Sequence, residues 1–267
     1  MAQGTHDPDS DLEGGKMPLL DHLVELRQRL VISGVAFILC FFVGYWLAEP
    51  IFTFLVQPLA DITHGQQGRR MIYTALHEAF FTYIKVGFFF AACVSFPIVS
   101  LQIWKFVAPG LYKHERKAAI PFIVATPVLF TMGAAMVYYV VVPLAWKFFL
   151  GFEHPDGNGD LPLVLEPKVD QYLSLVMRLI FAFGVAFELP VLIVLLAKVG
   201  IVGVDGLRAK RKYAIVVAFV AAAILTPPDV ISQVMLAVPI ILLYEISIVC
   251  AHFIEKKREQ EQAAEGP

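Results

Sequence analysis

Long apolar stretches, each bounded by charged residues or by proline and glycine, dominate the pattern of this chain. A transmembrane helix needs about 20 apolar residues to cross roughly 30 Å of hydrocarbon. The pattern therefore predicts an all-α, polytopic membrane protein with six transmembrane helices, at residues 30–47, 80–107, 118–142, 172–199, 213–225 and 230–253. The apolar segment 50–59 is too short for a seventh span, and we predict that it lies in the interface or re-enters on the far side.

The predicted fifth span is unusually short. Residues 213–225 would rise only about 20 Å as a helix, and the turn Thr226-Pro227-Pro228-Asp229 joins this span directly to the sixth. We hypothesise that the bilayer thins at this hairpin or that the hairpin lies behind longer helices. Prolines inside several spans each bend a helix, which favours a curved body over a straight bundle.

A leucine stripe precedes the first span. Leu19, Leu23, Leu26 and Leu30 recur at helical spacing, which predicts an amphipathic helix lying at the cytoplasmic surface. The domain organisation follows from these elements. Residues 1–16 are predicted to form a disordered cytoplasmic tail, residues 17–253 the six-helix membrane domain, and residues 254–267 a cytoplasmic C-terminal tail.

Composition supports a membrane protein and disfavours other classes. Hydrophobic residues make up 58% of the 267 residues, charged residues only 16%, and the mean hydropathy is +0.70, values unlike those of a soluble domain. Without a basic patch interleaved with aromatic residues, no nucleic-acid partner is expected. The three cysteines lack the spacing and the company of metal ligands, so we expect neither a metal nor a cofactor.

The distribution of lysine and arginine predicts the orientation. Most of the 21 cationic residues fall in the tails and in one set of loops, and the exceptions are Arg69, Arg70, Lys147 and Lys168 in the other loops and Lys85 and Arg178 within spans. Cytoplasmic loops carry the excess of Lys and Arg, so both termini are predicted to be cytoplasmic. The acidic N-terminus lacks the features of a secretory or transit peptide, which favours a prokaryotic cytoplasmic (inner) membrane.

Several polar residues in or beside the spans require an explanation. Glu25 can pair with Arg29 one helical turn away, and Glu115 can pair with cations of its own loop. Glu188 lies near the middle of the fourth span, where an ionised carboxylate costs at least about 3 kcal/mol. We therefore interpret Glu188 as a functional polar site. Gln233 can make an interhelical hydrogen bond.

The sequence contains no hydrolase elbow, zinc-protease motif or phosphate loop, and we predict that the protein is not an enzyme. An intramembrane hydrolase is poorly supported, because no span contains a nucleophile–base pair. Glu188 leaves a second interpretation open, in which the chain is a proton-coupled small-molecule transporter and Glu188 carries the proton.

Four motifs, in order along the chain, resemble those of the TatC family, the receptor subunit of the twin-arginine protein translocase. They are HLVELRQRL at 22–30, FVAPGLYKHER at 106–116, FGVAFELP at 183–190 and LTPPDVISQ at 225–233. The resemblance implies a glove-like arrangement with short fifth and sixth helices, and a receptor for the signal peptides of folded cargo. It also implies assembly with TatA- and TatB-type single-span proteins and with other TatC copies, and transport driven by the proton-motive force.

By motif match, Glu25 and Glu115 correspond to the acids that receive the two arginines of the signal peptide. Carboxylates suit this role because they accept a guanidinium group through two parallel hydrogen bonds, which lysine cannot supply. The resemblance assigns four further residues to the same recognition surface: Arg27, Phe106, Pro109 and Leu111.

The other matched residues concern the membrane interior and the far side. Glu188 corresponds to the intramembrane glutamate of the family, and Asp229 and Gln233 to its far-side loop and polar partner-contact position. Arg178 matches no motif position and receives no role. The copy number, the cargo, the open pathway and the presence of a separate TatB are left open by the sequence.

Overall fold

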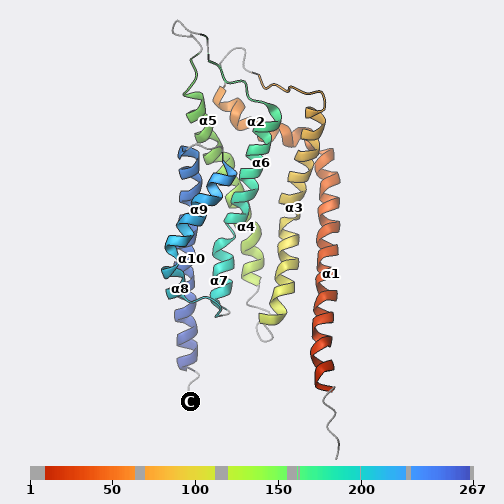
Figure 1. Ribbon diagram of the computed structural model, residues 1–267, viewed down its shortest axis with the longest axis vertical. Coiled ribbons are helices and arrows are strands. Elements are labelled where there is room, and N and C mark those ends of the chain that lie inside the picture. The colour runs from red at the N-terminus through yellow and green to blue at the C-terminus, as the bar shows by residue number, and fades with distance from the viewer. Residues whose placement is uncertain are drawn as a thin grey trace, which may run out of the picture.

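A computed structural model describes residues 10–63, 70–111, 120–154, 161, 163–198, 200–226 and 230–264 of the chain. Long helices run side by side, and the first part of α1 and the last part of α10 lie at the same end of the molecule (Figure 1). In chain order the helices are α1 (Ser10–Trp46), α2 (Ala48–Thr63), α3 (Glu78–Leu111), α4 (Ile120–Met136), the π-helical turn η2 (Val137–Val141), α5 (Val142–Leu150), α6 (Val169–Ala186), α7 (Leu189–Lys198), α8 (Val204–Ala209), α9 (Arg211–Leu225) and α10 (Val230–Ala264).

The prediction of an all-α membrane protein is confirmed. Among the described residues, β-pairing is limited to two isolated bridges, Ile72 with Lys168 and His154 with Leu163. The predicted fifth span is α9, which has only 15 residues. The other predicted spans correspond to runs that are long and apolar enough to cross a membrane: His22–Trp46, Glu78–Phe106, Ile123–Leu150, Val169–Lys198 and Gln233–Lys256.

Two helices continue past positions where the sequence analysis predicted that a helix would end. The amphipathic segment expected to lie on the surface as a separate helix is instead part of α1, because residues 19–33 contain neither proline nor glycine to interrupt the backbone ladder. The third span, expected to end at residue 142, continues to Leu150. In η2 the Val142 N–H donates to the carbonyl of Val137, and this wider turn accommodates Pro143, which has no N–H.

Helix α10 is longer than the resemblance implied for a sixth helix. It has 35 residues, and α1 begins at Ser10, so helices extend into both segments expected as tails. The polar residues that follow Phe253 are Glu, Lys, Arg and Gln, all good helix formers. Helix α10 therefore continues beyond the end of its apolar run. The disorder of residues 1–16 stays a prediction.

Helix α6 forms the centre of the fold. Its Leu173, Val176 and Phe183 are at most 1% exposed, and it packs against α3 and α4. Helix α1 lies at the edge and packs mainly on α3 (Figure 1). Large side chains of α1 such as Leu39 and Phe42 are therefore exposed, as expected for a surface that contacts lipid tails.

Short segments tie the long helices together at the end of the molecule opposite the first part of α1, where α2 lies across the helix ends (Figure 1). The Val169 N–H donates to the Ile72 carbonyl at 2.9 Å, and the Ile72 N–H donates to the Pro167 carbonyl at 3.1 Å. Lys85 of α3 forms an ion pair with Asp170 of α6. This pair accounts for a cation that the sequence places inside the second span.

Candidate functional site

The first half of α1 holds a carboxylate that is already paired. Arg29 Nη2 donates to Glu25 Oε1 at 3.0 Å, and the two side chains are 28% and 31% exposed, respectively. The four-residue spacing places them on one face of the helix, so the pairing considered from the sequence is present. A partly exposed pair of this kind contributes only about 0–1 kcal/mol to stability.

A second helix supplies another acceptor to the same guanidinium group. Arg29 Nη1 donates to Gln102 Oε1 of α3 at 3.2 Å, and Gln102 is only 9% exposed. Arg29 Nε is buried and has no hydrogen-bond partner within the described residues. The Arg29 side chain is therefore held between α1 and α3, and leaving one N–H unpaired carries an energetic cost.

An aromatic pair joins the same two helices. The rings of His22 and Phe106 stack with their centroids 4.2 Å apart and their planes 18° from parallel. Phe106 is half-buried, whereas Arg27, on the same helix as Glu25, is exposed. Because this ring pair and the Glu25–Arg29–Gln102 group both bridge α1 and α3, they form one surface between these two helices.

The structure brings only part of the predicted peptide-binding set together. Glu25 and Phe106 lie on helices that pack along each other. Pro109 and Leu111 belong to the last turn of α3, and their side chains are not among those described. Glu115 lies outside the described residues, so its proximity to Glu25 stays a prediction.

Glu188 lies at a break in the fourth predicted span. Helix α6 ends at Ala186 and α7 begins at Leu189. Pro190 has no N–H and cannot continue the regular backbone ladder, which resumes where the Leu192 N–H donates to the Glu188 carbonyl at 2.9 Å. Interrupted helices at membrane depth are found where they line a polar or ligand site.

Thr126 of α4 is the polar neighbour of Glu188. Its hydroxyl lies beside the carboxyl group, and the residue is only 2% exposed. Neither Thr126 Oγ1 nor Glu188 Oε1 has a partner with good hydrogen-bond geometry in the described part of the chain. Because buried polar atoms are nearly always hydrogen-bonded, this pair can accept a further partner from water or from another chain.

Two glycines bring α4 and α6 into close contact near Glu188. A Cβ atom on Gly133 would lie 2.6 Å from the carbonyl oxygen of Phe183, and one on Gly184 would lie 2.5 Å from the ring of Phe130. Small residues allow membrane helices to approach this closely. Gly184, which belongs to the same motif as Glu188, therefore has a packing role.

The predicted far-side contact residues are only partly described. The Gln233 side-chain amide donates to the Phe219 carbonyl at 3.1 Å, which connects α10 to α9. The interhelical hydrogen bond considered from the sequence is thus present, and a contact between Gln233 and a partner protein stays a prediction. Asp229 lies outside the described residues.

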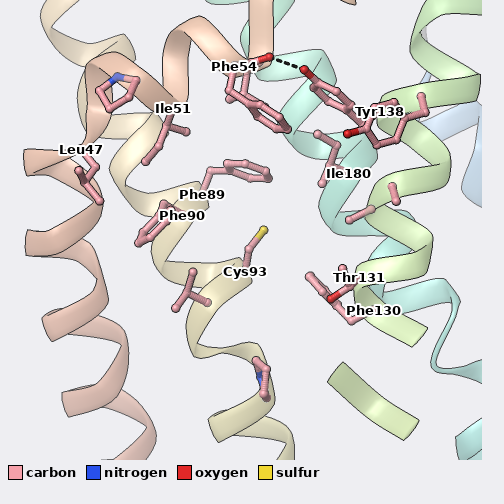
Figure 2. A pocket seen from close by; sticks show the side chains of 17 residues that line it. Leu47, Ile51, Phe54, Phe89, Phe90, Cys93, Phe130, Thr131, Tyr138 and Ile180 are labelled. Atoms are coloured by element: carbon pink, nitrogen blue, oxygen red, sulfur yellow. Dashed lines mark hydrogen bonds between the residues drawn. The ribbon is translucent and has the colours of Figure 1, made fainter. Parts of the chain in front are cut away.

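An apolar groove of about 740 Å³ separates α3 from α4 beneath α2 (Figure 2). Figure 2 shows Cys93 of α3 and Thr131 of α4 facing each other across it, with Ile180 of α6 behind. The Tyr138 hydroxyl donates to the Phe54 carbonyl at 2.7 Å, and the two rings stack. The lining suits an apolar helix or lipid acyl chains.

The family profile described as "Sec-independent protein translocase protein (TatC)" matches residues 21–239. The chain belongs to the TatC family. TatC from Magnetococcus marinus is 54% identical over 250 residues, covering 94% of this chain and 89% of the relative. TatC from Escherichia coli (strain K12) is 43% identical over 246 residues, covering 92% of each chain.

Solved structures agree with this assignment. A crystal structure titled as the twin arginine translocase receptor TatC superimposes with a TM-score of 0.77 at 37% identity, covering 87% of this chain and 99% of the other. A second, in DDM, gives a TM-score of 0.76 at 38% identity, covering 86% and 99%. The predicted TatC resemblance is therefore confirmed, and the family is one of protein translocase components rather than of enzymes.

Two residues of these TatC surfaces were missed from the sequence. Gln102 and Thr126 are uncharged polar residues within apolar runs, and such residues carry no distinctive pattern. They are identified as site residues only in the structure, where Gln102 is buried against Arg29 and Thr126 is buried against Glu188. Arg178, for which the TatC resemblance gave no role, is exposed on α6.

Proposed function

We propose that this chain is the core receptor of a twin-arginine translocation system and binds the signal peptides of folded proteins through Glu25 and Glu115. The observation that carries the proposal is the Glu25 carboxylate at the cytoplasmic end of α1, which accepts a hydrogen bond from a guanidinium group at 3.0 Å. A carboxylate that already binds one arginine side chain has the chemistry needed to bind another. The relatives' names and the receptor title of the similar crystal structure support the same function.

Recognition of two adjacent arginines requires two acids. Glu25 is supplied by α1, and Glu115 follows α3, the helix that packs along α1. Each carboxylate takes one guanidinium group, and the stacked rings of His22 and Phe106 offer an apolar surface beside them. Arg27, Pro109 and Leu111 complete this surface in the proposal.

Glu188 is proposed to serve a different step, the docking of TatA- or TatB-type single-span helices. Glu188 and Thr126 present two buried polar atoms without partners in the described residues, and a polar side chain of a neighbouring helix would satisfy them. Asp229 and Gln233 are proposed as contacts of the same kind near the far side. Transport itself is proposed to use the proton-motive force and several TatC copies.

The membrane topology of the proposal follows the distribution of Lys and Arg. Both termini face the cytoplasm, and the protein resides in a prokaryotic cytoplasmic (inner) membrane. The positions of the first part of α1 and the last part of α10 at one end of the molecule are consistent with this topology (Figure 1).

Site-specific crosslinking tests the receptor function. A twin-arginine signal peptide carrying a photoreactive group is added to membranes containing wild-type protein or the Glu25→Ala/Glu115→Ala variant. The double variant is expected to insert normally and to lose the crosslink, because each charge-assisted hydrogen bond contributes about 1.5–3 kcal/mol. A peptide with two lysines in place of the arginines is the matched control. An undiminished crosslink in the double variant would exclude these acids as the binding site.

The alternative function, a proton-coupled small-molecule transporter, is favoured by one observation, the unpaired Glu188 Oε1 within a membrane span. Purified protein in liposomes distinguishes the two functions. The receptor is expected to produce no uptake of small solutes under an imposed proton gradient. Uptake that is lost in Glu188→Gln would favour the transporter.

A further inference from the structure

The geometry around Glu25 points to a role for Arg29 that depends on the proposed function. The guanidinium group of Arg29 occupies the same carboxylate that is proposed to bind the signal peptide. We propose that Arg29 is an internal occupant of the Glu25 site, which an arginine of the incoming peptide has to displace. Arg29 thereby keeps the affinity of the receptor low enough for the peptide to leave.

The position of Arg29 is determined by two helices. One terminal nitrogen donates to Glu25 of α1 at 3.0 Å, and the other donates to Gln102 of α3 at 3.2 Å. Gln102 is 9% exposed, so its amide is a fixed acceptor rather than a mobile surface group. Arg29 is therefore held beside Glu25 before any peptide arrives.

The contact with Glu25 is weaker than the contact that a peptide arginine can make. Because one terminal nitrogen of Arg29 is used by Gln102, Arg29 donates to Glu25 through the other nitrogen alone. An incoming guanidinium group can donate through two nitrogens, which is the stronger geometry. The exchange is thus favourable, and Arg29 can retain its bond to Gln102 when it releases Glu25.

Displacement of an internal occupant has a defined thermodynamic consequence. A competitor within the protein lowers the affinity of every cationic ligand for Glu25 by the same factor. Partly exposed ion pairs contribute up to about 1 kcal/mol, which corresponds to roughly a fivefold change in affinity. Arg29 therefore sets the absolute affinity, and the preference for arginine over lysine comes from the carboxylates themselves.

The test is a titration of the full-length protein in nanodiscs with a fluorescent twin-arginine peptide, followed by anisotropy at fixed low salt. Arg29→Gln is expected to bind the peptide about two- to fivefold more tightly, with an unchanged ratio between the twin-arginine and twin-lysine peptides. Unchanged or weaker binding in Arg29→Gln would overturn the proposal.

Two controls separate displacement of Arg29 from a general effect of positive charge near the site. Lys105 is exposed on α3 next to Phe106, and Lys105→Gln removes a nearby positive charge that makes no contact with Glu25. A gain in Lys105→Gln equal to that in Arg29→Gln would assign the effect to general charge and overturn the proposal. The effect of Arg29→Gln is also expected to vanish when Glu25→Gln is present, and an effect that persists would have the same consequence.

The same titration distinguishes failure of the inference from failure of the proposed function. If Glu25→Gln binds the twin-arginine peptide as wild type does, Glu25 is not the binding residue and the function proposed for it fails. If Glu25→Gln loses binding while Arg29→Gln gains none, the receptor site stands and only the role of Arg29 is excluded.

Discussion

Two glutamates of the proposed function, Glu25 and Glu188, differ in their surroundings. Glu25, in the first half of α1, is partly exposed and held by Arg29, which Gln102 anchors from another helix. Glu188, at a helix break within the membrane, keeps one buried oxygen without a partner in the described residues. Glu25 is paired although water could have solvated it. Glu188 keeps an oxygen without a partner in the described part of the chain, although an unsolvated carboxyl group is most costly within the membrane.

This contrast indicates that the two sites would bind a partner in different ways. A paired surface carboxylate can exchange its partner at little energetic cost, because water and other cations are always available. A carboxyl group in the membrane that has one buried oxygen without a well-placed partner gains when another polar group arrives, because a buried polar atom without a hydrogen bond is costly. Reversible recognition suits the first arrangement, and stable assembly with a membrane partner suits the second.

The largest expected effect comes from disturbing the helix contact that supports Glu188. In Gly133→Ala the new Cβ would lie 2.6 Å from the Phe183 carbonyl oxygen, so α4 and α6 have to separate. We expect a loss of about 1–3 kcal/mol in stability, measured by thermal unfolding in detergent, together with loss of export. Gly34→Ala is the control, because nothing lies within 4 Å of the added Cβ. Equal melting temperatures for the two variants would contradict the packing role of Gly133.

Removing the Glu188 carboxyl group is expected to separate stability from function. Glu188→Ala eliminates a buried oxygen without a partner, and we expect stability to stay equal or to rise by about 1–3 kcal/mol. Signal-peptide binding should be retained while export or partner assembly falls. The measurements are melting temperature, peptide crosslinking and copurification of the single-span partners. A clear loss of stability would show that Glu188 has a partner inside the folded chain.

A smaller effect is expected at Gln233, whose side-chain amide already donates to the Phe219 carbonyl. Gln233→Leu removes one interhelical hydrogen bond between α9 and α10, which contributes about 0.6 kcal/mol on average in membrane proteins. A slightly lower melting temperature with intact peptide binding is the expected result. Gln57→Leu, at a residue that bonds Asp61 on its own helix, provides a comparison that does not touch an interhelical contact.

The smallest effect on stability is expected from exchanging the partners of the Glu25–Arg29 pair. Glu25→Arg/Arg29→Glu keeps two opposite charges four residues apart, and such pairs contribute only a few tenths of a kcal/mol. The melting temperature should therefore change little, whereas peptide binding should be lost because the acid has moved by one helical turn. Retained binding would mean that the position of the carboxylate is unimportant, in contradiction to the site proposed at residue 25.

The comparison also shows what the sequence could and could not predict. The apolar runs were sufficient for the helical membrane class, and the motifs were sufficient for the family. Pro143 could have ended the third span, and only the structure shows that η2 accommodates it. The pairing of Glu25 with Arg29 could be considered from their spacing, but the contribution of Gln102 depends on how α1 packs on α3, which no local pattern contains.

The π-helical turn η2 has a further consequence for residues 120–150. A turn with one additional residue rotates everything after it by about 100° relative to a regular helix. The lipid-facing and core-facing positions of α5 therefore follow a different phase from those of α4, although the two helices form one continuous span. Deleting a single residue from η2 should realign the two halves and turn Trp146 away from Tyr172, whose rings now lie 5.2 Å apart.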